Sequence, residues 1–473
     1  MKDKNNFKIA LPYVMTRMLG YLVSMISIPL LTSIFSKDDY GVISTLEASI
    51  SLLVSLFLFG IPQSYIRFYS KYKKSDELNQ LDSSYFRIVA ILAILSFCIS
   101  LIFFTFFLSV EFSIIYLSLG VSFAVILQLL SAIIRGQERT FLHACILGLS
   151  DLLYYIVPVI SVLVIGASID TFFISQLFSP FLLIILVLFK VKNNISFNKH
   201  DLSITRNLLL FGIPLVLLSF GSTLLAQSDK IIINLMIGSE EVAVYAVASK
   251  ISHAIQQLLI FPIAMVLFPM YTRIWEEEGS QKTSYVLSNW FEKYSFISIP
   301  IIAGSFIIRK NLILLLSNEL YMDAAILIPL LTGGLLIYGA YYFISAGFFL
   351  SNKTKNLGYL IIIISFLNII LSLILGKIIG VLGVTISTVV SYIIFMLATY
   401  FLGKKTLTLK IDYTILLNFS LKSIVMIIIV RLIPVVDLNI LSLIIKILVS
   451  VFIYLLLNVG YIKKNIMGGK KQW

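Results

Sequence analysis

The stretch FGIPLVLLSFGSTLLAQSDKIIINLMIGSEEVAVYAVASKI, residues 211–251, consists of two predicted apolar helices joined by a short acidic turn. The first helix carries Asp229 and Lys230 within its apolar run, and the second carries Lys250 about two turns after it begins. An unpaired charge near the centre of a bilayer costs about 2.5–3.5 kcal/mol. We therefore expect these charges to face protein or water rather than lipid.

This stretch has a counterpart 202 positions earlier in the chain. Pro214 aligns with Pro12, and the acidic pair at 240–241 aligns with the acidic pair at 38–39. Two landmarks at one offset predict an internal duplication. Because an even number of membrane crossings would separate the copies, both would enter the membrane in the same direction, as in transporters built from parallel repeats.

The composition is that of a polytopic membrane protein. Hydrophobic residues make up 59% of the chain and charged residues 12%, and the mean hydropathy is +1.02, whereas a soluble domain carries about 25% charged residues. The net charge of +13 comes from Lys and Arg between apolar runs, which indicates membrane topology rather than nucleic-acid binding. The spacing of Cys98, Cys145, His143, His200 and His253 predicts neither a disulfide framework nor a metal site.

Fourteen apolar runs are long enough to cross about 30 Å of hydrocarbon. They cover residues 9–35, 42–69, 85–110, 113–134, 141–166, 172–190, 207–237, 242–270, 285–308, 324–350, 358–376, 380–402, 414–433 and 440–461. The expected domains are an amino-terminal six-helix lobe (1–190), a cytoplasmic linker (191–206), a second six-helix lobe (207–403), and two additional helices with a basic tail (404–473).

Lys and Arg are distributed unevenly between the two sides of these runs. Loops on the amino-terminal side hold 23, whereas the opposite loops hold five, namely Lys37, Arg309, Lys310, Lys377 and Arg431. Since basic loops remain in the cytoplasm, both termini are predicted to be cytoplasmic. The outer loops are too short for an external catalytic domain, and no nucleotide-binding or hydrolase motif is present. We expect no enzymatic activity and no cofactor.

Two charges lie deep in predicted spans. Arg17 is about eight residues, or roughly 12 Å, inside the first span. It would either pair with an acid or snorkel to the cytoplasmic face, or it would bind a phosphate through its planar fork. Asp151, near the middle of the fifth span, is either that structural partner or a titrating group for ion coupling.

Three further features are predicted from the repeat and from local composition. Glu47 lies one residue from the repeat equivalent of Lys250, so a salt bridge between them could close the outer face when the lobes meet. Lys230 and Lys250 would make the outer half of a shared cavity cationic. The aromatic cluster of Tyr338, Tyr341 and Tyr342 would either stack on sugars or pack in the core.

Several segments resemble the multidrug/oligosaccharidyl-lipid/polysaccharide (MOP) flippase superfamily, in particular its bacterial polysaccharide (Wzx-type) branch. They are IPLLTSIFSKDDYGVIS at 28–44, FGIPQSYIRFYSKYK at 59–73, SDKIIINLMIGSEEVAVYAVASKI at 228–251, LYMDAAILIPLL at 320–331 and GKIIGVLGVTISTVVSY at 376–392. The resemblance implies an all-α fold with two six-helix lobes around a central cavity and alternating access by rocking of the lobes. It also implies that undecaprenyl-pyrophosphate-linked oligosaccharide, such as an O-antigen or capsule repeat unit, is moved from the inner to the outer leaflet of the bacterial inner membrane.

Fourteen spans and a cationic set depart from the drug exporters of this superfamily and favour an anionic substrate. The predicted pyrophosphate-binding residues are Arg17, Lys230 and Lys250, and the predicted coupling or gate residues are Asp151, Glu47 and Asp229. The expected partners are the lipid-linked oligosaccharide, membrane lipids, and a polysaccharide polymerase with other assembly proteins. A lipid II flippase and a drug exporter remain alternatives, as does a membrane-embedded glycan polymerase or ligase.

Overall fold

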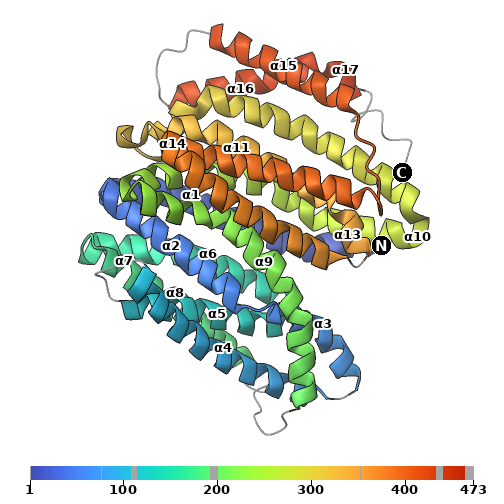
Figure 1. Ribbon diagram of the computed structural model, residues 1–473. Helices are drawn as coiled ribbons and strands as arrows, with labels where there is room; N and C mark the ends of the chain where they lie inside the picture. The colour runs from blue at the N-terminus through green and yellow to red at the C-terminus, as the bar shows by residue number, and fades with distance from the viewer. Residues whose placement is uncertain are drawn as a thin grey trace. The chain divides into compact units, whose positions relative to one another are not determined.

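The computed structural model describes residues 2–75, 77–107, 114–191, 201–351, 353–432 and 440–463, with backbone alone for residues 2–11. Throughout these residues the regular elements are helices (Figure 1). Among these described residues, twelve helical stretches are long and apolar enough to cross a membrane. The expected all-α membrane fold is therefore confirmed.

The helices follow one another with short connections. The first eight are α1 (Lys2–Ile34), α2 (Lys37–Phe57), α3 (Ile61–Lys74), α4 (Leu78–Phe107), α5 (Ile114–Gly136), α6 (Thr140–Ile165), α7 (Ile169–Gln176) and α8 (Phe178–Val191). They are followed by α9 (Leu202–Met236), α10 (Ser239–Leu316), the 3₁₀ turn η2 (Glu319–Tyr321), α11 (Ala324–Gly339), α12 (Tyr341–Ile344), α13 (Ala346–Leu350), α14 (Thr354–Gly403), α15 (Tyr413–Leu432), α16 (Ile440–Leu457) and α17 (Val459–Tyr461).

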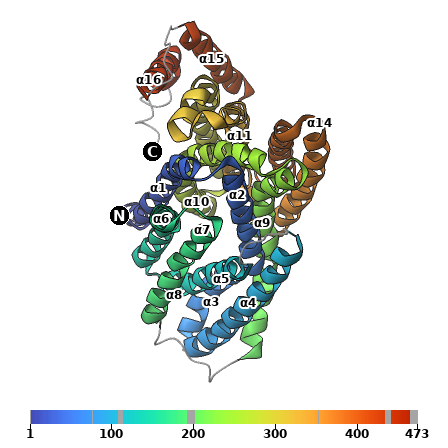
Figure 2. The ribbon, with the colours of Figure 1, turned by 90° about the vertical axis from the view of Figure 1, so that its left-hand side faces the viewer.

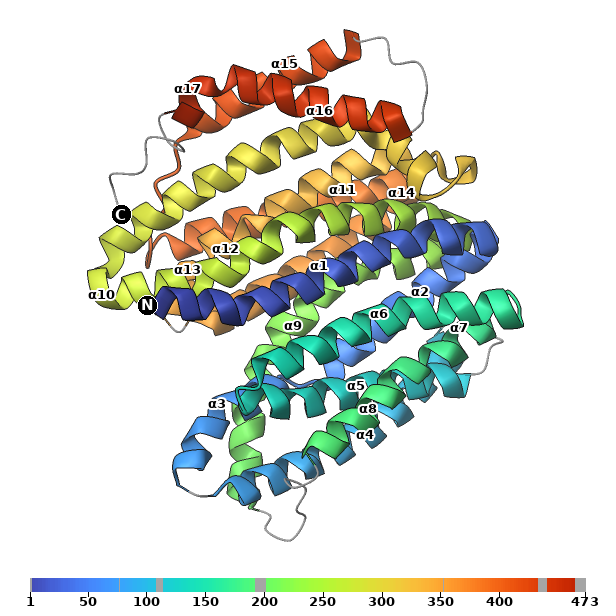
Figure 3. The ribbon, with the colours of Figure 1, turned by 180° about the vertical axis from the view of Figure 1, so that it is seen from behind.

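Two of the twelve stretches contain a reversal. In α10 the chain turns at Gly279, where φ is 81°, and Figure 3 shows the two arms that meet at this turn. In α14 it turns at Ile379 and Gly380, where the φ of Gly380 is 62°. A positive φ is readily adopted by glycine. In the described part of the chain, twelve stretches with two internal reversals correspond to fourteen candidate crossings, which agrees with the fourteen predicted runs.

The chain divides into two compact units. The first contains residues 1–243 and 353–387, and the second contains residues 244–352 and 388–473. In the first unit α5 packs between α4 and α8, and α1 lies along α6 (Figure 2). The division into two six-helix lobes at residues 191–206 remains a prediction.

The landmarks of the predicted duplication occupy equivalent places in the structure. Pro12 lies inside α1 and Pro214 inside α9. Each acidic pair lies in the first turn of the next helix, residues 38–39 in α2 and residues 240–241 in α10. Carboxylates are favoured there because the helix dipole places partial positive charge at the amino terminus. This explains why an acidic pair recurs after each long apolar run.

Close backbone packing at the two ends of α2 joins this part of the first unit to α9 and to the first residue of α10. At one end, a Cβ added to Gly41 would overlap the carbonyl oxygen of Ser239. At the other end, a Cβ on Gly60 would overlap the carbonyl oxygen of Gly212, and a Cβ on Gly212 would lie 2.5 Å from the carbonyl oxygen of Phe59. Gly60 also has a φ of 61°. Only glycine permits both the approach and the conformation at this position.

In the second unit, the two carboxy-terminal helices pack on the second arm of α10. Phe296 and Ala303 of α10 form one apolar cluster with Phe419 and Met426 of α15 and Tyr454 of α16. The opposite faces of α15 and α16 expose many large apolar side chains, as expected for helices that border lipid. The helices α15 and α16 therefore form a hairpin that packs on α10 and is part of the second unit.

Candidate functional site

Arg17 and Asp151 form an ion pair in the first unit. The Nη1 atom of Arg17 lies 3.0 Å from Oδ2 of Asp151, and the side chains keep 33% and 30% of their surface exposed. The pair is positioned by close packing of α1 on α6. A Cβ added to Gly20 would lie 2.8 Å from Oδ2 of Asp151, and one added to Gly148 would lie 2.9 Å from the side chain of Thr16.

The guanidinium of Arg17 has hydrogen-bond donors that its ion pair with Asp151 does not use. A guanidinium has five N–H donors in a planar fork, and the contact with Asp151 involves one of its nitrogens, Nη1. The exposed part of Arg17 can therefore offer further donors to a second anion. The structure thus shows the pairing of Arg17 with Asp151, which the sequence analysis left as one alternative for each residue. Their roles in phosphate binding and in ion coupling remain predictions.

A second polar group lies in the middle of α9. Asp229 is fully buried and Lys230 is 6% exposed, and the Lys230 ammonium donates a hydrogen bond of 3.2 Å to Oε1 of Gln227. Ser228 donates to Oδ1 of Asn368 on α14 at 3.4 Å. Asp229 and Lys230 therefore face protein rather than lipid, as expected. Ser228, next to the buried Asp229, therefore lies at a polar contact between α9 and the first arm of α14.

Glu47 belongs to a third group of polar side chains, and it is the one member of this group that the sequence analysis predicted. It is 9% exposed on α2, and its carboxyl lies beside the hydroxyl of Tyr154 on α6, which also lies next to the amide of Gln176 on α7. Among the described residues, Nε2 of Gln176 has no hydrogen-bond partner. One sequence signal for this group was available. Asp151 and Tyr154 are three residues apart, which places both side chains on one face of a helix.

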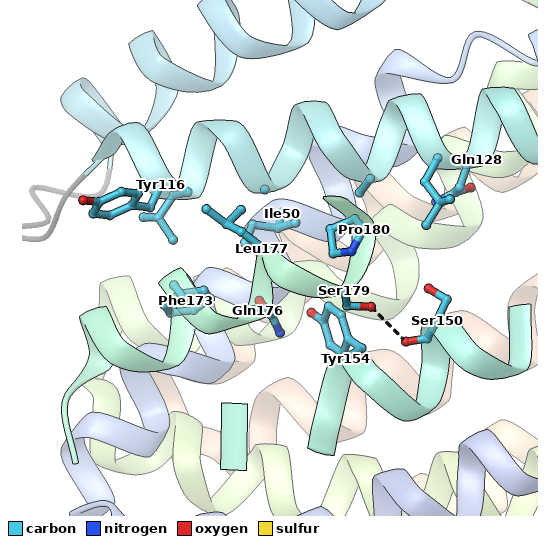
Figure 4. Close-up of a pocket in the computed structure, with 14 residues that line it drawn as sticks. Ile50, Tyr116, Gln128, Ser150, Tyr154, Phe173, Gln176, Leu177, Ser179 and Pro180 are labelled. Carbon is cyan, nitrogen blue, oxygen red and sulfur yellow. Dashed lines mark hydrogen bonds between the residues drawn. The ribbon is translucent and has the colours of Figure 1, made fainter. Parts of the chain in front are cut away.

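Tyr154 and Gln176 line a pocket inside the first unit (Figure 4). Its volume is about 180 Å³, which leaves room for several water molecules. Polar lining is supplied also by Ser150 and Ser179, and the Ser179 hydroxyl donates to the carbonyl oxygen of Ser150 at 3.5 Å. The pocket therefore combines apolar walls with polar groups able to hold water next to Glu47.

The remaining predicted residues lie in the second unit. Lys250, on the first arm of α10, has a buried ammonium. Because Lys250 and Glu47 belong to different units, their predicted salt bridge remains a prediction, as does a cavity shared by Lys230 and Lys250. Sequence reasoning also passed over Lys446 in α16, although a lysine inside an apolar run was a visible signal.

The aromatic cluster is packed on itself. The rings of Tyr338 and Tyr341 are stacked with centroids 5.9 Å apart, and both rings contact Phe395. Tyr342 meets Tyr341 edge-on at 5.8 Å. Core packing accounts for these contacts, and sugar stacking is not needed to explain them.

Solved structures with the same fold are transporters. The structure titled "Lipid II flippase MurJ, inward closed conformation" matches with a TM-score of 0.76 at 19% identity, covering 97% of this chain and 100% of that chain. A multidrug resistance MATE family transporter of the MOP superfamily matches in its inward-facing conformation with a TM-score of 0.69 at 14% identity, covering 82% of this chain and 94% of that one. This chain therefore shares its fold with a lipid II flippase and with a MATE family transporter.

Sequence comparison identifies the family. A curated protein from Methanocaldococcus jannaschii, described as "Uncharacterized membrane protein MJ1068", is 25% identical over 427 residues, which cover 83% of this chain and 82% of that protein. The family described as "Polysaccharide biosynthesis protein" matches residues 8–275, more than half of the 473 residues. The chain therefore belongs to the polysaccharide biosynthesis protein family.

Proposed function

We propose that this protein is a flippase that moves undecaprenyl-pyrophosphate-linked oligosaccharide from the inner to the outer leaflet of the bacterial inner membrane. The observation that carries the proposal is the partly exposed Arg17 side chain, which Asp151 holds inside a membrane span through Nη1. Desolvating a pyrophosphate requires fixed cations. A donor fork in a polysaccharide biosynthesis protein fits such a substrate.

The carboxy-terminal hairpin also favours a lipid-linked substrate. The fold of the lipid II flippase covers 97% of this chain, so it includes most of α15 and α16. The drug transporter covers 82%. A substrate with a polyprenyl tail needs a protein surface beside lipid, and the exposed apolar faces of α15 and α16 offer one. Lipid II transport and drug export are the alternatives, and a glycan polymerase or ligase is a weaker one.

Transport would be driven by an ion gradient or by membrane potential. Asp229 and Glu47 are the candidate coupling carboxylates, because both are buried in the first unit. Asp151 is less suited to this role because Arg17 already compensates its charge. Lys230 and Lys250 are further candidates for binding the pyrophosphate.

Deletion of the protein tests the function directly. Lipid-linked sugars would be extracted and their leaflet determined by accessibility to a membrane-impermeant periodate or lectin probe. We expect complete repeat units to accumulate on the cytoplasmic leaflet, and a plasmid copy of the gene to restore them to the outer leaflet. Unpolymerised units on the outer leaflet would instead indicate a polymerase, and unchanged glycan with accumulated lipid II would indicate the lipid II alternative.

The proposed direction of transport requires the predicted membrane topology, and reporter fusions can test this topology. Reporter fusions after Lys74, Lys199 and Lys405 should report the cytoplasm, because the loops on that side hold 23 of the 28 loop cations. Fusions after Asp39 and Asp323 should report the outside. An inverted pair would contradict the fourteen crossings and the proposed direction of transport.

A further inference from the structure

Three of the five cations on the predicted outer face lie near the carboxy-terminal ends of α10 and α15, two helices of the second unit that pack together. Arg309 and Lys310 lie in the last turns of α10, and Arg431 lies in the last turn of α15. They follow directly after residues that pack together, since Ile307 of α10 and Val430 of α15 belong to one apolar cluster. The same ends of α10, α15 and α16 can be followed in Figure 3.

Lys446 of α16 is joined to the end of α10 through a buried amide. Its ammonium donates to Oδ1 of Asn311 on α10 at 3.1 Å, and Nδ2 of Asn311 donates to the hydroxyl of Ser442 at 2.7 Å. Asn311 is 3% exposed and Ser442 is 2% exposed. The neutral amide fixes the lysine while leaving two of its three N–H donors and its full charge available.

Among the residues that the structure describes, no carboxylate pairs with these four cations. Within the described ranges, Arg309, Lys310, Arg431 and Lys446 form no ion pair. Lys446 lies about six residues, or roughly 9 Å, inside α16, where an uncompensated charge is expensive. The positive-inside tendency also makes cations uncommon on this face. An external anion would satisfy both observations.

We propose that Arg309, Lys310, Arg431 and Lys446, the outer cationic cluster, bind the phosphate of an anionic lipid. A lipid fits better than a free ion because Lys446 lies within a helix that otherwise exposes apolar side chains, such as Leu448 and Phe452. Its tail would lie along α16 while its phosphate reaches the guanidinium forks at the helix ends. The phosphate could come from a phospholipid of that leaflet or, if the proposed function holds, from the pyrophosphate of the delivered glycan lipid.

Lipid retention on the purified full-length protein tests this proposal. Detergent-solubilised protein would be incubated with phosphatidylglycerol, undecaprenyl pyrophosphate or zwitterionic phosphatidylcholine, and bound lipid would be counted by native mass spectrometry. We expect Lys446→Gln to weaken retention of an anionic lipid about tenfold, since it removes a full charge next to the phosphate. Lys446→Arg should retain the lipid. The matched control is Lys404→Gln, an exposed lysine in the same unit on a loop assigned to the cytoplasm, which should bind like the unaltered protein.

Asn311→Asp provides the sharpest variant. It is nearly isosteric and keeps Lys446, but it places a carboxylate where the amide oxygen now lies 3.1 Å from the ammonium. The new ion pair should displace the lipid phosphate, so retention should fall as in Lys446→Gln. Arg431→Gln, at an exposed helix end, keeps the test available if a buried variant does not accumulate in the membrane.

The outcomes separate the two lipid sources and the two proposals. A charge-dependent loss with phosphatidylglycerol alone identifies a phospholipid site, and a larger loss with undecaprenyl pyrophosphate identifies the delivered substrate. Equal retention by the unaltered protein, Lys446→Gln, Asn311→Asp and Arg431→Gln would overturn the site. Because the phosphatidylglycerol experiment does not involve transport, it can succeed even if the deletion experiment rejects the flippase.

Discussion

Arg17→Lys is expected to lower export of the lipid-linked glycan about tenfold or more, although it keeps the charge. An ammonium offers a point contact, whereas the guanidinium can hold Asp151 through Nη1 and still present further donors to a pyrophosphate. Export would be measured as outer-leaflet glycan lipid per unit of membrane-inserted protein. The matched control is Arg139→Lys, an exposed arginine next to the amino terminus of α6, which should export normally.

A double variant distinguishes phosphate binding from charge balance. If Arg17 only compensates Asp151, Arg17→Ala should be rescued by Asp151→Asn, because removing both members of a pair costs less than stranding one. If Arg17 binds the pyrophosphate, the double variant should be inserted normally and still fail to export. A well-inserted Arg17→Lys protein with full export would contradict the phosphate-binding role and leave Lys230 and Lys250 as candidates.

Gly60→Ala should destabilise the first unit by about 2–5 kcal/mol. The left-handed conformation costs a residue with a Cβ about 1–2 kcal/mol, and the overlap with the Gly212 carbonyl adds about 1–3 kcal/mol. Thermal unfolding of the detergent-solubilised protein should show a melting temperature lower by about 5 °C or more. Gly212→Ala tests the overlap alone, because Gly212 has no positive φ.

Gly304→Ala is the control for both glycine variants. Nothing lies within 4 Å of a Cβ added at Gly304, and alanine is favoured over glycine in a helix interior. This variant should be as stable as the unaltered protein or slightly more stable. Normal stability of Gly60→Ala and Gly212→Ala would show that the close approach of α2 to α9 does not hold the unit together.

The membrane crossings could be predicted because they depend on properties that run along the chain. Length, apolarity and loop charge are local, so the fourteen crossings and the acidic turns followed from the sequence alone. The pairing of Arg17 with Asp151 could only be left as one alternative, since the residues are 134 positions apart and several acids were available. The packing of α1 on α6 determines which acid pairs with Arg17, and the local sequence around Arg17 does not contain this information.

Other features of the structure could not be predicted, because a single sequence contains no clear signal for them. Glycine is common in membrane helices, so nothing marked Gly60 and Gly212 as partners rather than as ordinary helix residues. The group of Glu47, Tyr154 and Gln176 comes from three helices, and one of its members is a tyrosine among many. Such groups form only when packing brings distant residues together.

The contact of α2 with α9 has a consequence for biosynthesis. Gly212 is made about 150 residues after Gly60, which at 5–20 residues per second is about 8–30 s later. Residues 353–387 of the first unit emerge later still, after the stretch 244–352 that belongs to the second unit. The first unit is thus synthesised in two separate parts. The glycines at the two ends of α2 stay uncovered until α9 and the start of α10 have been made.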